Sequence, residues 1–158
     1  GGATAQVSDA EYPKYYDYII DHDWYCLAKQ QVDPGIIVGG VIETNVSLHF
    51  ARKNSYEAYR FTGSGDQVVT YQGRDYRSRF SMEGFGVNDS SFGTGVSIVS
   101  AKITSGDTLP NNWTWDDSDY INLHLVQDKP DYKYPYYLEG SDNSVNGLVT
   151  YECVVKEN

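Results

Sequence analysis

Residues 120–127 read YINLHLVQ, and this alternation decides the fold class. Successive side chains of an extended strand point to opposite faces of the sheet. Ile121, Leu123 and Leu125 therefore share one face, while the polar residues between them share the other. The pattern predicts a strand with one side in a core and the other in water.

Residues 74–82 read RDYRSRFSM and repeat the same pattern. Tyr76, Phe80 and Met82 lie on one face, and charged Asp and Arg side chains lie on the other. Two amphipathic strands so far apart in the chain indicate a β-sheet protein rather than a helical one.

The composition supports many strands joined by acidic turns. The 158 residues include 15 Tyr and 15 Asp but only 7 Glu. Tyr is enriched in strands, whereas Asp favours turns and is a good ligand for hard cations. Nine segments bounded by turn residues are candidate strands: 24–31, 36–43, 45–52, 56–62, 67–72, 75–82, 95–104, 120–127 and 147–156.

The glycine-rich segments 63–66 and 140–143 are interpreted as breaks between strands. About eight to nine short strands at this spacing predict a single antiparallel β-sandwich or jelly-roll-like domain. We place that β-sandwich domain at residues 24–158 and a separate N-terminal arm at residues 1–23.

The N-terminal arm carries several large apolar side chains. Tyr12, Tyr16, Ile19 and Ile20 fall at helical spacing, so the arm is either a short helix with an apolar stripe or an extended donor strand. Such a stripe has to dock, either on its own domain or on a neighbouring copy. The sequence leaves both possibilities open.

The two cysteines lie in strand-like segments near opposite ends of the chain. Terminal strands often pair in antiparallel domains, so we predict a disulfide between Cys26 and Cys153, with two reduced core cysteines as the alternative. Ala3-Thr4-Ala5 resembles a signal-peptidase site. Both features favour a secreted or cell-surface protein.

The charge limits the partners. A formal net charge of −10 argues against nucleic acid, whose phosphates are recognised by clustered Lys and Arg. The longest run without a polar side chain, residues 35–42, is far too short for a membrane-spanning helix, so no membrane insertion is expected.

Aspartates gather in three places that suit Ca²⁺, a cation that takes six to eight oxygen ligands. Residues 142–147 read DNSVNG and match the opening of an EF-hand loop, but the twelfth position is Cys153 rather than Glu. The alternative is capped turns on a solvated surface. The candidate metal ligands are Asp21, Asp23, Asp116, Asp117, Asp119 and Asp142.

Aromatic side chains form a second group of candidates. Trp113 and Trp115 flank Thr114, and Tyr134 and Tyr136 lie in a tyrosine-rich segment. Their flat rings suit stacking on a sugar or on another protein, whereas core packing is the simpler interpretation.

The sequence contains no GxSxG, no GxxxxGK and no Cys-His nucleophile context, so we expect no enzyme. Our leading hypothesis is an extracellular fibre subunit that binds other copies of itself by exchange of the N-terminal arm, with Ca²⁺ as a candidate cofactor. The alternative is a carbohydrate-binding module or adhesin with the Trp and Tyr side chains as its platform. A third hypothesis is a ligand-carrying β-barrel whose first strand contains Trp24.

Overall fold

The structure, a computed structural model, describes most of the strands and several of their connections. The described residues are 18–31, 41–55, 58–89, 93–108, 120–144 and 147–157. The predicted interface residues Tyr12 and Tyr16 lie outside them, as do Trp113, Trp115 and the three predicted ligands Asp116, Asp117 and Asp119.

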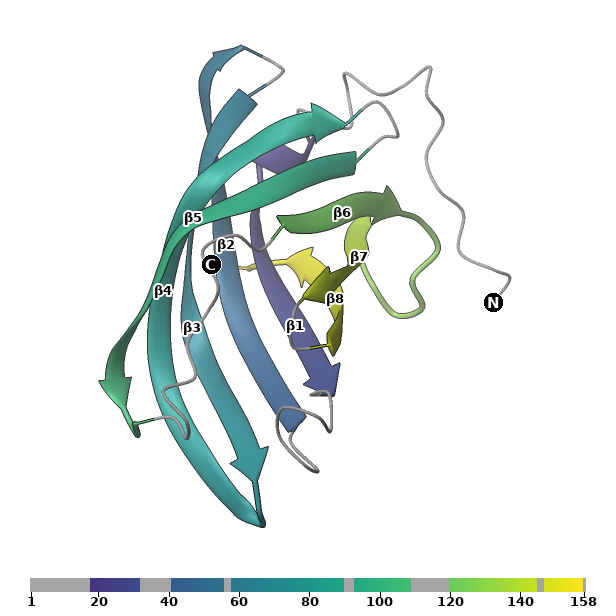
Figure 1. The fold of residues 1–158 in the computed structure, drawn as a ribbon. Helices are drawn as coiled ribbons and strands as arrows, with labels where there is room; N and C mark the ends of the chain where they lie inside the picture. The colour runs from purple at the N-terminus through teal and green to yellow at the C-terminus, as the bar shows by residue number, and fades with distance from the viewer. Residues whose placement is uncertain are drawn as a thin grey trace.

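Eight strands form one closed antiparallel barrel in which each strand pairs with the next along the chain (Figure 1). The strands are β1 (Asp23–Gln31), β2 (Val41–Ser55), β3 (Ala58–Tyr71), β4 (Arg74–Asp89), β5 (Gly93–Gly106), β6 (Tyr120–Val126), β7 (Tyr137–Ser144) and β8 (Gly147–Val155). The ladder between β8 and β1 closes the sheet. The predictions of an all-β and antiparallel fold are confirmed, but the prediction of a sandwich is wrong.

The prediction of a sandwich is wrong because the strands are longer than the sequence pattern indicated. β2 to β5 are 14 to 16 residues long, and strands of this length coil around the axis until the ends of the sheet meet. The predicted break at 63–66 lies inside β3, whose ladder with β2 continues through Gly63 and Gly65. A Cβ atom at Gly65 would lie 1.9 Å from the backbone oxygen of Asn45. Gly65 therefore permits a close backbone approach, and neither glycine ends the strand.

β7 was missed for the same reason. The predicted break at 140–143 lies in this strand, where Gly140 pairs with Leu123 on one side and Tyr151 on the other. A Cβ atom at Gly140 would lie 1.9 Å from the backbone oxygen of Asn122. The glycine again marks a tight approach of neighbouring strands.

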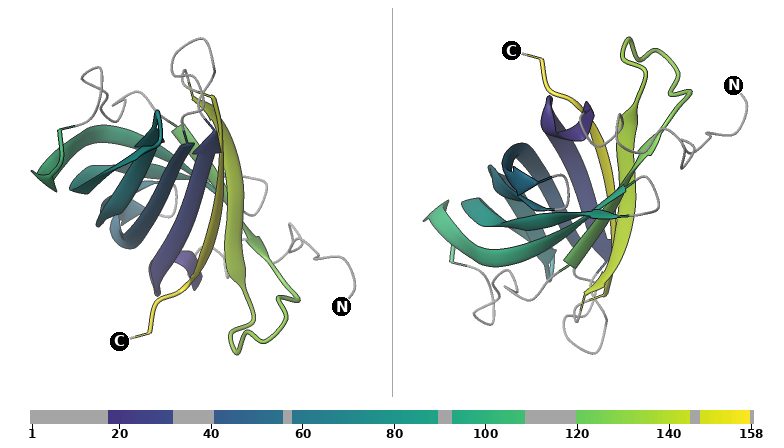
Figure 2. Two further views of the ribbon diagram at one scale, coloured as in Figure 1. Left: turned by 90° about the horizontal axis from the view of Figure 1, so that it is seen from below. Right: turned by 90° about the horizontal axis from the view of Figure 1, so that it is seen from above.

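The hydrophobic core lies inside the barrel. The views from below and above show β1, in purple, beside β8, in yellow (Figure 2). The largest fully buried side chains are Trp24, Phe50, Phe61, Phe80, Ile19, Leu123, Leu125, Leu138 and Val69.

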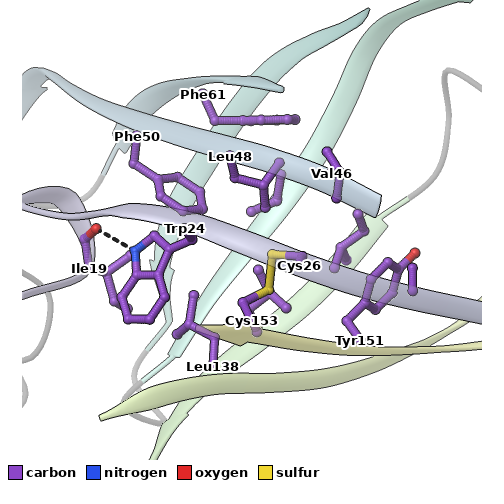
Figure 3. Close-up of a cluster of buried hydrophobic side chains, with 14 of the residues drawn as sticks. Ile19, Trp24, Cys26, Val46, Leu48, Phe50, Phe61, Leu138, Tyr151 and Cys153 are labelled. Carbon is purple, nitrogen blue, oxygen red and sulfur yellow. Dashed lines mark hydrogen bonds between the residues drawn. A yellow bond between two sulfur atoms is a disulfide. The ribbon is translucent and has the colours of Figure 1, made fainter. Parts of the chain in front are cut away.

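The described end of the N-terminal arm belongs to this core. Residues 18–20 form a helical turn, and Ile19 is buried with 1% of its surface exposed. The indole N–H of Trp24 donates a hydrogen bond of 3.0 Å to the carbonyl oxygen of Ile19 (Figure 3). Ile20 is partly buried and packs against the core cluster. This part of the arm therefore docks on its own domain.

The predicted disulfide is confirmed. Cys26 and Cys153 are bonded, and they lie directly opposite each other in the ladder between β1 and β8. Among the described residues, no helix is long and apolar enough to cross a membrane.

Candidate functional site

The two ends of the barrel differ in chemistry. At the end where β1 begins, called the Trp24 end, Trp24 packs with large apolar side chains of neighbouring strands, among them Phe50 and Leu138 (Figure 3). At the other end, called the Gln30 end, β1, β3, β5 and β7 terminate and the buried side chains include polar ones.

A tyrosine cluster closes the Trp24 end from outside the core. It consists of Tyr18 on the helical turn and Tyr132, Tyr134 and Tyr136 from the connection between β6 and β7. The hydroxyl of Tyr132 donates to the carbonyl oxygen of Tyr136 at 2.8 Å and accepts a bond of 3.0 Å from the backbone N–H of Val155. The connection is thereby fixed onto the last residues of β8.

Tyr18 is the most perturbed member of this cluster. Its hydroxyl oxygen is buried without a hydrogen-bond partner among the described residues. Burial, together with the neighbouring hydroxyls of Tyr132, Tyr134 and Tyr136, raises the pKa of Tyr18 to about 12. The group is therefore neutral throughout the physiological pH range.

The predicted interface residues Tyr134 and Tyr136 lie in this cluster. Both are partly buried and pack against the core. The hydroxyl of Tyr134 reaches the carboxylate of Glu157 at 3.2 Å, and the ring of Tyr136 meets that of Tyr18 edge to face at 5.1 Å. These contacts match the simpler interpretation of the two aromatics as packing residues.

The Gln30 end contains the arrangement that we consider the candidate site. Four inner positions of neighbouring strands lie side by side and carry only small or uncharged polar side chains. This set, called the polar row, consists of Ala28, Thr44, Gln67 and Ser78.

The polar row is buried. Thr44, Gln67 and Ser78 each expose 3–4% of their surface, and together with Gln30 they are the buried polar residues among the described part of the chain. The amide nitrogen of Gln67 donates a hydrogen bond of 3.1 Å to the hydroxyl of Ser78. A row of polar side chains inside an otherwise apolar core is unusual, because polar groups pay a desolvation penalty there.

The neighbouring inner rows show how the polar row differs. One position nearer the Trp24 end, the same four strands contribute Cys26, Val46, Gly65 and Phe80. One position nearer the Gln30 end, they contribute Gln30, Ile42, Val69 and Tyr76. The polar row therefore lies between two rows that are mainly apolar.

On the side of β5 that faces β6, the described pairing covers only part of the strand. β5 pairs with β6 only over Gly93–Ser97, and from Ile98 to Gly106 its pairing within the described residues is with β4 alone. The connection that follows β5 contains Trp113 and Trp115, which lie outside the described residues. Their predicted role as ligand-binding residues stays a prediction.

Three of the six predicted metal ligands, Asp21, Asp23 and Asp142, lie among the described residues. Among the described residues there is no group of three or more His, Cys, Asp or Glu side chains placed to hold a metal ion. Asp21 is exposed on a turn, and the carboxylate of Asp23 forms an ion pair with the ring of His49. Asp142 pairs with Val149 in the ladder between β7 and β8, so the sequence 142–147 spans a hairpin.

Two depressions lie on the outside of the barrel. One, of about 590 Å³, crosses β7, β8, β1 and β2 and is lined by Leu27, which is 54% exposed, together with Glu139 and Glu152. The other, of about 630 Å³, lies at the Trp24 end beside Asp21, Asp23 and His49. Both are lined largely by solvated side chains of mixed charge.

Sequence analysis missed the polar row, although part of its signal was visible. Ser78 alternates with Phe80 and Met82, which were placed on the apolar face, so a polar side chain on that face was readable. Thr44 and Gln67 gave no such signal, because 44 fell between two predicted strands and 67 at the start of another. Only the register shows that the three side chains are neighbours.

Comparison with known proteins gives no assignment. No family model matches the chain, and no curated protein matches it.

Proposed function

We propose that this protein is a non-catalytic carrier that binds one small, largely apolar molecule inside the barrel at the Gln30 end. The observation that supports this function is the buried polar row between two mainly apolar rows. Ligand sites are typically lined by apolar side chains with a few placed polar groups, which this arrangement provides.

The architecture is compatible with this role. An eight-stranded barrel is wide enough either to be filled by its own side chains or to hold one small ligand. Here the Trp24 end is filled by Trp24, Phe50 and their neighbours, whereas the polar row has only short side chains and the Gln67 amide. Many barrels of this size have unrelated functions, so the buried polar row, and not the barrel architecture, supports the carrier function.

We also propose that the carrier is secreted. The disulfide supports this, because such bonds persist mainly in oxidising compartments.

A fluorescent apolar reporter tests the function. N-phenyl-1-naphthylamine, which is neutral, should bind with one site per chain and gain fluorescence. Ala28→Phe fills the polar row and should abolish binding, whereas Leu27→Phe places the same side chain on the outer face and should leave binding unchanged. Circular dichroism confirms that both variants fold. Equal binding by the two variants would contradict an interior site.

The other two hypotheses stay proposals with less support. Arm exchange in a fibre depends on residues 1–17, and the described residues 18–20 dock on their own barrel. The carbohydrate platform depends on Trp113 and Trp115, since Tyr134 and Tyr136 pack against the core.

A further inference from the structure

This inference rests on the proposed carrier function and concerns the chemical class of the ligand. We infer that the ligand is a neutral amphiphile, an apolar body with one hydroxyl, amide or carbonyl group, and that it enters the barrel with this polar group first.

The neutrality follows from the side chains of the polar row. Thr44, Gln67 and Ser78 are uncharged, and Gln30 is the only other buried polar residue among those described. An ionised carboxylate or ammonium group taken into this site would lose its water shell without meeting an opposite charge among the side chains of the polar row. A neutral polar group has a far smaller desolvation penalty, and hydrogen bonds can offset it.

The available hydrogen bonds fit a group that both donates and accepts. Gln67 gives one amide N–H to Ser78, and its amide also carries a second N–H and a carbonyl oxygen. Thr44 lies directly opposite Gln67 in the ladder, a position that places their side chains within contact distance on the inner wall. A ligand hydroxyl between them can donate to the carbonyl of Gln67 and accept from the hydroxyl of Thr44.

The orientation follows from the order of the rows along the axis. The row nearer the Gln30 end includes Ile42, Val69 and Tyr76, and Val69 is buried with 1% of its surface exposed. A ligand that enters from this end meets the polar row only after it passes these apolar side chains. Its polar group therefore lies deepest, and its apolar body packs against them.

Three probes with the same chain and different head groups test the class. 1-Decanol, decanoate and decylammonium are titrated at about pH 7 by displacement of N-phenyl-1-naphthylamine, with isothermal calorimetry as a second readout. We expect decanol to bind at least about 10-fold more tightly than either ion, because burying an unpaired charge costs several kcal/mol. Decanoate or decylammonium binding as tightly as decanol would overturn the inference while leaving the carrier function intact. Failure of the reporter and of all three probes would overturn the carrier function itself.

A matched pair of variants tests the residues. Thr44→Val keeps the shape and removes the hydroxyl, so it should weaken decanol binding about 3- to 10-fold, the loss typical of one neutral hydrogen bond. The same change at Thr62, which is exposed on the outer face of β3, should have no effect. Gln67→Leu should act like Thr44→Val and weaken decanol binding. Unchanged decanol affinity in both inner variants would contradict the assignment of the polar row.

Discussion

Cys26 and Cys153 face each other across the ladder that closes the barrel, so one covalent bond joins the first strand to the last. Both side chains point into the core, where Val46 and Leu138 are their neighbours in register (Figure 3). The disulfide therefore fixes the ladder between β1 and β8 at a level between the apolar Trp24 end and the polar row.

Loss of this bond should weaken the whole domain. The two cysteines are separated by 127 residues, and a cross-link over such a loop stabilises the folded state by up to about 5 kcal/mol in the chain-entropy model. We expect the double variant Cys26→Ala, Cys153→Ala to unfold at a markedly lower urea concentration. The native protein should weigh about 2 Da less than its reduced form, since the disulfide lacks two hydrogens. Two cysteines that react freely with an alkylating reagent in the folded protein would contradict the structure.

The strands that could be predicted are those with a clean alternation. The segments 120–127 and 147–156 nearly coincide with β6 and β8, and 24–31 with β1. Apolar residues recur at every second position in 120–127 and 147–156, and no glycine lies inside any of the three segments. Local sequence is sufficient there, because the strand is bounded by its own turn residues.

The closure of the barrel could not be predicted from local sequence. A glycine inside a long strand and a glycine in a turn look alike until the neighbouring strand is known. Gly65 and Gly140 have the same local appearance as turn glycines, yet each lies where a neighbouring backbone leaves no room for a Cβ atom. The polar row was missed for a related reason, since its neighbouring members lie 11 to 23 residues apart in the chain and become neighbours only through register.

Two glycines on the inner face of β3 should respond differently to alanine. At Gly65 the added Cβ would lie 1.9 Å from the backbone oxygen of Asn45, so the ladder between β2 and β3 has to shift. We expect Gly65→Ala to destabilise the domain by about 3 kcal/mol or more. At Gly63 the nearest atoms belong to the side chains of Leu48, at 2.9 Å, and Met82, at 3.0 Å, which can adjust. Gly63→Ala should cost about 1 kcal/mol. Urea unfolding of both variants measures the difference, and equal losses would contradict the role of Gly65.

The buried hydroxyl of Tyr18 should make stability fall at high pH. The pKa of Tyr18 is raised from 10.0 to about 12 in the folded protein, mainly by burial. Between these two values the unfolded chain has lost the proton and the folded chain still holds it, so rising pH favours unfolding. The contribution of the protonated Tyr18 hydroxyl to the stability of the folded protein is complete below about pH 10 and is lost by about pH 12.

Tyr18→Phe is the test of that dependence. The variant lacks the titrating group, so its stability should fall less steeply between about pH 9 and pH 11.5, measured by urea unfolding. Near neutral pH it should be as stable as the native protein or more so, because the removed hydroxyl has no partner among the described residues. Parallel stability curves for the two proteins would show that Tyr18 titrates normally.

Truncation of the arm separates cis docking from assembly. Deletion of residues 1–17 leaves Tyr18 and Ile19 in place, so the described contacts of the arm with the barrel all remain. Deletion of residues 1–20 removes Ile19 from the core and leaves the indole N–H of Trp24 without its acceptor. That loss should cost several kcal/mol, at roughly 1.5–3 kcal/mol for each large buried side chain. Circular dichroism measures stability, and light scattering of the full chain and of the shorter deletion measures assembly. Filaments formed by the full chain and abolished by removal of residues 1–17 alone would favour a fibre subunit over a carrier, whereas a particle of constant size in both proteins would refute arm exchange.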